Sequence, residues 1–158
     1  MRCLHNFLAA AKSLIDHTRA FVNFHYQKHS FSKLYQGEVE RNFASDPLSS
    51  FVQDLRNYFL HKGMPSISMV IKVGEQSYSS IFLNTANLKK WDKWNAKSLL
   101  YLELQPDEFR LLDPVVEYKS KLTIFNEWFE KELHNIHAEE IIEFNILQER
   151  YRSLMNRR

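Results

Sequence analysis

The stretch from Asp113 to Leu154 constrains the fold most, because it carries a helical pattern of apolar residues and contains no Gly, and no Pro after Pro114. Its start, Asp113-Pro114, joins a capping side chain to a residue suited to the first helical turn. The apolar positions fall mostly three or four residues apart, as on one side of a helix. They are Leu122, Phe125, Phe129, Leu133, Ile136, Ile141, Phe144, Leu147 and Leu154. The stretch predicts a long C-terminal helix, and two helices joined near His134-Asn135 are the alternative.

The rest of the composition agrees with a mainly α fold. The 158 residues include 3 Gly and 4 Pro, with 44% hydrophobic and 25% charged residues. So few turn formers argue against an all-β sandwich. Chain length and the lack of a recognisable linker or repeat predict a single domain over residues 1–158. We therefore expect a helical bundle with one inserted β-hairpin.

Two helices are predicted before residue 43. Residues 3–29 carry an amphipathic stripe, and Ser30 or Ser32 can cap a second helix that runs through Asn42. His25 and His29 continue the first stripe at a spacing of four. Because a metal site needs three or more converging ligands, packing or hydrogen bonding explains this pair better than a metal does.

A third helix has clear start and stop signals. Asp46 can accept hydrogen bonds from free backbone amides, and Pro47 suits the first helical position. The pattern continues to His61, where Gly63 supplies a left-handed residue and Pro65 prevents continuation. This helix is therefore expected to span residues 47–61.

The period changes after the third helix. Residues 66–73 alternate as a strand does, Gly74-Glu75 can turn tightly, and residues 76–83 return. This predicts a β-hairpin at about 66–83, which must pack on the helices or on a partner because a lone hairpin is not stable. Residues 84–105 then hold short helical pieces, with Trp91 and Trp94 as anchors.

The candidate site lies at the end of the third helix, where Arg56, Asn57 and His61 form the pattern Arg-polar-three residues-His. Positions five apart are about 140° apart around a helix axis, so Arg56 and His61 do not share a face. Asn57 and His61, four apart, do share one. Arg56 and His61 can meet if the last turn unwinds. A two-fold dimer would also bring two copies of each into one cleft.

Such a cleft would suit RNA cleavage. Arg56 offers a fixed fork of donors to a phosphate, and an imidazole at His61 can move protons to or from ribose oxygens. A helix C-terminus favours a cation, which suits a general acid. No metal is needed if the ribose 2′-hydroxyl is the nucleophile.

A structural interpretation of the same residues stays open. Arg56 can pair with Asp54, Glu38 or Glu40, and His61 can cap carbonyls at the helix end. Asn57 can belong to the same local network.

The segment LRNYFLHKGMP at residues 55–65 resembles the signature of the HEPN superfamily, in which an Arg is followed after four to six residues by His. The resemblance implies a helical bundle and a metal-independent endoribonuclease whose site forms across a homodimer. It implies Arg56 and His61 as catalytic residues with Asn57 in support. Catalytic members are often toxins or anti-phage components, which implies an antitoxin protein as partner. Other members serve as non-catalytic binding or assembly modules, and the hairpin is not part of the superfamily's core.

A second patch could contact RNA. Lys89, Lys90 and Lys93 interleave with Trp91 and Trp94. Exposed aromatic rings stack on bases for about 1–3 kcal/mol each, and lysines attract phosphates. The alternative is a solvated lysine face with both tryptophans in the core, which is the more common arrangement in small domains.

Several function classes are excluded or disfavoured. The formal charge of +2 is too small to imply nucleic-acid binding without local clustering. Three glycines cannot build a P-loop, a dinucleotide fingerprint or a Gly-x-Ser-x-Gly elbow, so no cofactor is expected. The single cysteine, Cys3, allows no internal disulfide and fits a cytoplasmic setting. No metal site and no membrane span are expected.

Overall fold

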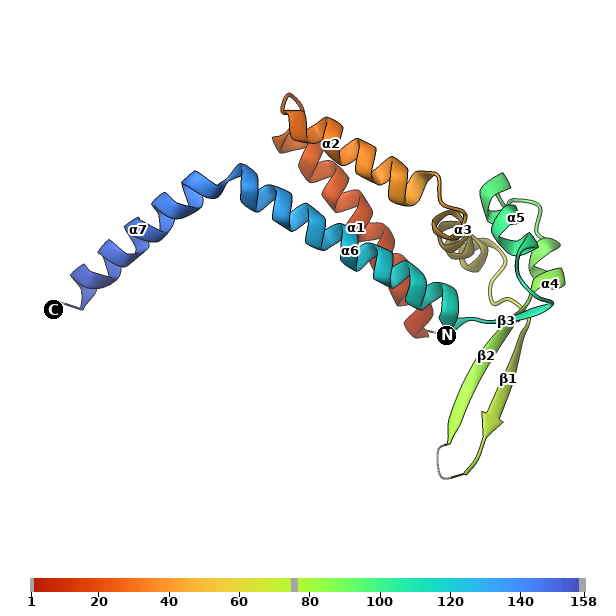
Figure 1. The fold of residues 1–158 in the computed structure, drawn as a ribbon. Coiled ribbons are helices and arrows are strands. Elements are labelled where there is room, and N and C mark those ends of the chain that lie inside the picture. Colours follow the sequence, from red (N-terminus) through yellow and green to blue (C-terminus); the bar gives the residue numbers. More distant parts are fainter. Residues whose placement is uncertain (1, 75–76, 157–158) are drawn as a thin grey trace. The chain divides into compact units, whose positions relative to one another are not determined.

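The computed structural model describes residues 2–74 and 77–156, and it is mainly α with a small antiparallel sheet (Figure 1). The predicted fold class is confirmed. The chain divides into two compact units, Met1–Leu122 and Thr123–Arg158. No helix within the described residues is both long enough and apolar enough to cross a membrane.

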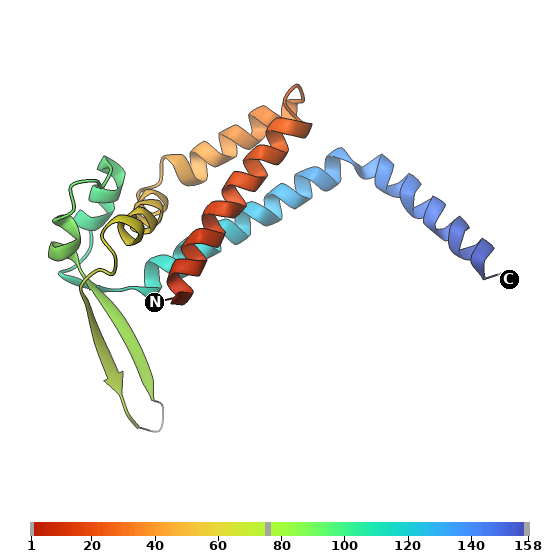
Figure 2. The same cartoon turned by 180° about the vertical axis from the view of Figure 1, so that it is seen from behind.

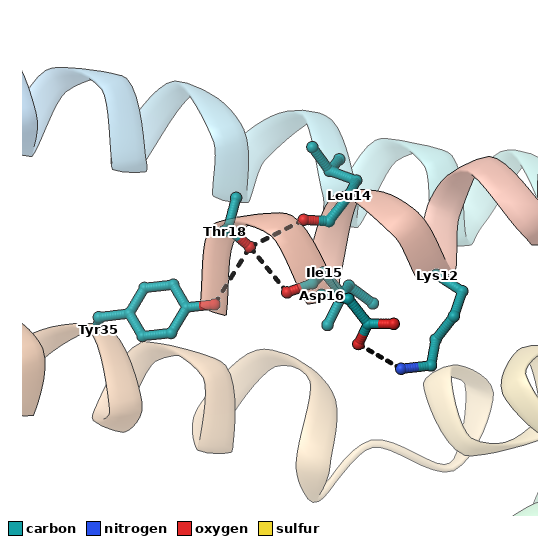
Figure 3. Close-up of polar contacts among 6 residues, drawn as sticks. All are labelled: Lys12, Leu14, Ile15, Asp16, Thr18 and Tyr35. Atoms are coloured by element: carbon teal, nitrogen blue, oxygen red, sulfur yellow. Dashed lines mark hydrogen bonds and ion pairs between the residues drawn. The ribbon is translucent and has the colours of Figure 1, made fainter. Parts of the chain in front are cut away.

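Helices α1 (Arg2–His25) and α2 (Ser30–Val39) pack against each other in the first unit. The Thr18 hydroxyl of α1 and the Tyr35 hydroxyl of α2 are hydrogen-bonded at 3.2 Å (Figure 3). Neither expected serine caps α2. The cap is His29, whose Nδ1 accepts a hydrogen bond from the Phe31 amide at 3.1 Å. The first helix is therefore shorter than predicted, because His29 already starts the next one.

Helix α2 runs directly into the π-helix η1 (Glu40–Ala44), so helical structure continues past the predicted end at Asn42. The chain then enters α3 (Pro47–His61), whose bounds match the prediction. Gly63 follows with a φ of +84°, the left-handed conformation that a glycine adopts without strain. The stop signal read from the sequence is thus the one that ends the helix.

Asp46 caps the start of α3. Its carboxylate accepts hydrogen bonds from the Ser49 amide at 2.9 Å and the Ser49 hydroxyl at 2.6 Å, and it pairs with Lys121 at 3.0 Å. Partial burial alone would raise the pKa of Asp46, but the hydrogen bonds from Ser49 and Lys121 outweigh it and lower that pKa. The cap therefore links the start of α3 to α6 (Leu112–Ile136), the helix that carries Lys121.

The predicted hairpin is formed by β1 (Ile67–Lys72) and β2 (Tyr78–Asn84), paired antiparallel with Ile67 opposite Leu83. The predicted turn includes residue 75, which lies outside the described residues. A third strand, β3 (Glu108–Arg110), was not expected and pairs with the other edge of β2. Figures 1 and 2 show the hairpin extending away from the helices of its unit.

The core of the first unit gathers around α3, which packs against α5 (Ala96–Glu103). Phe51 of α3 is fully buried and stacks on Trp94 and Tyr101. Helix α4 (Thr85–Lys89) leads from β2 into the loop that carries both tryptophans. Helix α5 and the loop with the two tryptophans thus cover one side of α3, the helix that carries the candidate motif.

The C-terminal pattern forms two helices, α6 (Leu112–Ile136) and α7 (Ala138–Met155), so the two-helix alternative is correct. The break falls at His137, whose φ of −105° and ψ of 21° are not helical. Glu139 and Glu140 occupy the first turn of α7, where acidic side chains favour a helix start. The chain can therefore begin a new helix there without a Gly or Pro.

Candidate functional site

Arg56 and Asn57 are half-buried on α3 and line a hollow of about 60 Å³. Lys12 of α1 and Tyr118 of α6 contribute to the same hollow, as does Gln53 one turn before Asn57. Ligand pockets are commonly about 300–1,000 Å³, so this space holds a few waters and no nucleotide. Two cationic side chains therefore meet at a surface depression that is too small to enclose a substrate by itself.

Tyr118 forms the buried wall of the hollow, with its ring 1% exposed and in edge contact with Phe7 and Phe43. Burial raises its pKa to about 12, nearby Asp46 adds to the rise, and a hydrogen bond with Gln53 opposes it. The phenol stays protonated at physiological pH. It can donate a hydrogen bond into the hollow but cannot serve there as a base.

Arg56 forms no ion pair or side-chain hydrogen bond within residues 2–74 and 77–156. Asp54 instead accepts hydrogen bonds from the Asn95 amide at 2.9 Å and the Ser98 hydroxyl at 2.8 Å. All three acids that could have neutralised the guanidinium are engaged elsewhere.

The remaining two acids are used close to their own positions. Glu38 accepts hydrogen bonds from Arg41 at 2.5 Å and Asn42 at 2.7 Å, and Glu40 accepts one from Ser45 at 3.0 Å. Lys12, the other cation at the hollow, does have a partner, since it pairs with Asp16 on its own helix (Figure 3). Its contact lowers the pKa of Asp16. Arg56 is thus the cation of this hollow whose charge is not neutralised by a described residue.

His61 is exposed at the last position of α3. It lies nine residues after buried Val52, which places it about 180° away around the helix, facing away from the core. Among the described residues its imidazole makes no hydrogen bond to the helix-end carbonyls, so the capping interpretation is not supported. The Lys62 amide donates a hydrogen bond to the Tyr58 carbonyl at 2.8 Å, so the last turn is helical in this structure and does not bring Arg56 and His61 together.

The second predicted patch divides into buried and exposed parts. Trp91 and Trp94 are 4% and 6% exposed, and their rings lie 4.8 Å apart at 89°. Tyr58 of α3 contacts both rings, at 5.3 and 5.8 Å. The expectation that the tryptophans anchor this segment is confirmed, and such rings have no face free for a base. They instead hold the helix that bears the Arg-x4-His pattern.

The lysines of this patch, Lys89, Lys90 and Lys93, are exposed. Lys90 donates a hydrogen bond to the Asn87 side chain at 2.8 Å. None of these three lysines lines the hollow at Arg56. A role for the lysines in contacting phosphates stays a prediction.

The histidine pair of the first helix is also used for packing. His25 lies 4.8 Å from the Phe21 ring, and His29 caps α2. Within the described residues no three His, Cys, Asp or Glu side chains gather closely enough to hold a metal ion.

Sequence reasoning did not find Lys12, Gln53 or Tyr118 as members of the hollow. Gln53 lies one helical turn from Asn57, so its proximity was readable from the spacing of α3. Lys12 and Tyr118 come from helices far away in the chain, and no local spacing connects them to Arg56. A scan against protein-family models, a search of curated proteins and a search of solved structures each found no match to this chain.

Proposed function

We propose that this protein is a metal-independent endoribonuclease of HEPN type that acts as a homodimer. Arg56 binds and neutralises the scissile phosphate, His61 transfers a proton, and Asn57 orients the phosphate or the imidazole. The basis is the pattern Arg56-Asn57-x3-His61 together with the environment of its arginine.

The observation that carries the proposal is the unneutralised charge of Arg56. This guanidinium is half-buried at a hollow beside a lysine, and no described carboxylate pairs with it. A cation in that position favours an anionic ligand, and the guanidinium fork matches a phosphate with two parallel hydrogen bonds. The acid closest in sequence, Asp54, lies about 200° away around α3 and bonds Ser98, so it does not neutralise Arg56.

The chemistry follows from these groups. The ribose 2′-oxygen attacks the adjacent phosphorus and gives its proton to a base, while the 5′-oxygen leaves and takes a proton from an acid. An imidazole exchanges protons near neutral pH, so His61 serves one of these two steps. Arg56 stabilises the charge that develops on the non-bridging phosphate oxygens.

A second copy of the chain supplies the missing geometry. Arg56 and His61 point in directions about 140° apart on an intact helix, so one chain does not converge them on one phosphodiester. Leu60 and Met64, beside His61, are 54% and 56% exposed and offer apolar surface for an interface. In a two-fold dimer through this end of α3, Arg56 of one copy acts with His61 of the other.

The direct test is RNA cleavage in the presence of EDTA. Arg56→Ala and His61→Ala are each expected to lower the cleavage rate at least 100-fold, the scale of losing one transition-state contact or proton donor. Arg19→Ala and His17→Ala, which alter exposed residues of the same types on α1, should retain the wild-type rate. Equal cleavage by wild type and both α3 variants would assign the activity to a contaminant and remove the proposal.

Mixing the two inactive variants tests the shared site. A heterodimer of Arg56→Ala and His61→Ala keeps one site with both groups intact. Random exchange of subunits makes half of the dimers mixed, so about a quarter of the wild-type activity should return. If both groups came from one chain, mixing would restore nothing.

The exposed lysines Lys89, Lys90 and Lys93 are proposed to contact the RNA backbone. Changing all three to Ala should weaken RNA binding and reduce the salt dependence of the affinity, since each lost phosphate contact lowers the slope by about one. An unchanged slope would remove the lysines from the proposed interface.

A non-catalytic binding module is the second candidate, and the hairpin favours it. Strand β1 is an edge of the sheet, and its exposed apolar residues include Met69 at 59% and Ile71 at 63%. An open edge with apolar side chains is a common seat for an added strand of a partner protein. Absence of any cleavage that depends on Arg56 or His61 would favour this role.

A further inference from the structure

A cavity of about 340 Å³ lies in the first unit, where the start of α1, strands β2 and β3 and the start of α6 meet. Its walls are mostly apolar, with Leu4, Phe7, Ile81 and Val115 among the lining residues. The volume is within the range of small-molecule sites, which is about 300–1,000 Å³. The Arg56 hollow shares no lining residue with it.

Ser80 is the buried polar group of this cavity. The residue is 8% exposed, and its hydroxyl forms no hydrogen bond with any residue that the structure describes. No fully buried side-chain nitrogen or oxygen among the described residues lacks a hydrogen-bond partner, so the unpaired Ser80 oxygen faces the open space of the cavity and is reached by water. A bound ligand displaces this water, so a ligand that hydrogen-bonds the Ser80 hydroxyl avoids the desolvation penalty that a purely apolar ligand would incur.

Arg110 supplies a positive charge at the same cavity. Strand register places Arg110 opposite Phe82, and Ser80 lies two residues before Phe82 on the same face of β2. Such diagonal neighbours have Cα atoms about 7–8 Å apart, a distance that one carboxylate can bridge between a hydroxyl and a long arginine. The Arg110 side chain is 45% exposed, and its ion pair with Asp113 is long, at 4.0 Å. It therefore has donors available for another anion.

We infer that this cavity binds a small apolar monocarboxylate, such as a medium-chain fatty acid. The carboxylate accepts hydrogen bonds from the Arg110 guanidinium and the Ser80 hydroxyl, and the hydrocarbon chain lies against the apolar walls. A neutral apolar molecule would leave the Ser80 hydroxyl unsatisfied. A cation would be repelled by Arg110. The inference does not depend on the proposed nuclease activity.

Calorimetric titration with decanoate tests this assignment. We expect saturable binding of one decanoate per chain, with Arg110→Gln weakening the affinity about tenfold or more, as for loss of a charged hydrogen bond. Ser80→Ala should weaken it a few-fold while leaving the thermal unfolding temperature nearly unchanged, because the hydroxyl has no hydrogen bond within the described chain to lose. Decyltrimethylammonium, which has the same chain length and the opposite charge, should not saturate the site.

Cys3 provides an independent readout, because it lines the cavity and is the one cysteine of the sequence. Bound decanoate should slow alkylation of Cys3 in the wild type and have much less effect in Arg110→Gln at the same concentration. The inference is overturned if decanoate shows no saturable binding. It is equally overturned if decyltrimethylammonium binds as tightly, or if Arg110→Gln binds decanoate with wild-type affinity.

Discussion

The two sides of α3 use charged residues in opposite ways. On one side Asp54 is tied to α5 by hydrogen bonds with Asn95 and Ser98, and Tyr58 lies against the rings of Trp91 and Trp94. On the other side Arg56 is half-buried beside a small hollow without any described carboxylate partner.

This difference separates residues that maintain the helix from residues that remain available. Groups on the α5 side have saturated contacts, so changing them should reduce stability. Arg56 and His61 have few contacts to lose, so changing them should spare stability and affect function. Predictions on both sides and at both ends of α3 can test that division.

The largest expected effect is on the tryptophan side. Trp94→Ala removes a ring that is 6% exposed, stacks on Phe51 and donates its indole hydrogen to the Leu88 carbonyl at 2.7 Å. We expect a loss of about 3–5 kcal/mol in the free energy of unfolding, measured by urea denaturation. Lys89→Ala, an exposed change nearby, should stay within about 0.5 kcal/mol. A small effect of Trp94→Ala would mean that this side does not anchor the helix.

The two charges of α3 provide a direct contrast. Asp54→Ala leaves the Asn95 amide and the buried Ser98 hydroxyl without their acceptor, so it should cost about 1–3 kcal/mol. Arg56→Ala should change the free energy of unfolding by less than about 0.5 kcal/mol. Equal losses in the two variants would contradict the division between the two sides of the helix.

The end of α3 is tested by a pair of glycines. Gly63→Ala forces a side chain into a left-handed conformation at φ +84° and should cost about 1–2 kcal/mol. Gly37→Ala lies inside α2, where a Cβ meets nothing within 4 Å, and should stabilise by about 0.5–1 kcal/mol. If Gly63→Ala raises the thermal unfolding temperature as Gly37→Ala is expected to do, the left-handed conformation of Gly63 does not set the helix end beside His61.

The smallest effect concerns the start of α3 and depends on pH. Asp46→Ala should cost about 1 kcal/mol at pH 7 by removing the cap. Because the folded-state pKa of Asp46 is lowered, its contribution is complete above the ordinary pKa of about 3.8 and disappears as the pH falls through the lower folded value. The difference between wild type and variant in urea unfolding should therefore shrink below pH 4.

Asp92→Ala is the matched control for that pH series. Asp92 is exposed and makes no side-chain hydrogen bond with a described residue. The free energy of unfolding of Asp92→Ala should stay close to that of the wild type from pH 7 to pH 3. If the difference in free energy of unfolding between wild type and Asp46→Ala does not change with pH, the negative charge of Asp46 does not contribute to the stabilisation by the cap.

Local signals were sufficient for α3 itself. Asp46-Pro47 and Gly63 bound the helix as predicted, because capping and backbone preferences act within a few residues. The alternating pattern likewise located both strands of the hairpin. The capping residue of α2 was predicted wrongly. The His29 imidazole, rather than a serine hydroxyl, accepts the hydrogen bond from a free amide at the start of this helix.

Long-range contacts could not be read in the same way. Strand β3 is three residues long, and its pairing with β2 depends on where the intervening helices return the chain. The hollow at Arg56 joins α1, α3 and α6, and its members Lys12 and Tyr118 are remote in the sequence. The same applies to Asp54, whose hydrogen bond with Ser98 depends on the packing of α5 on α3.

The sequence by itself determined a mainly α chain, the limits of α3, the hairpin and the 140° separation of Arg56 from His61, because these depend on local backbone energetics and helical geometry. The tertiary structure alone decided that both tryptophans are buried, that the neighbouring acids are occupied and that Arg56 is left without one. These outcomes depend on which surfaces meet when the chain folds, and burial and pairing energies are realised only between residues that the fold brings together.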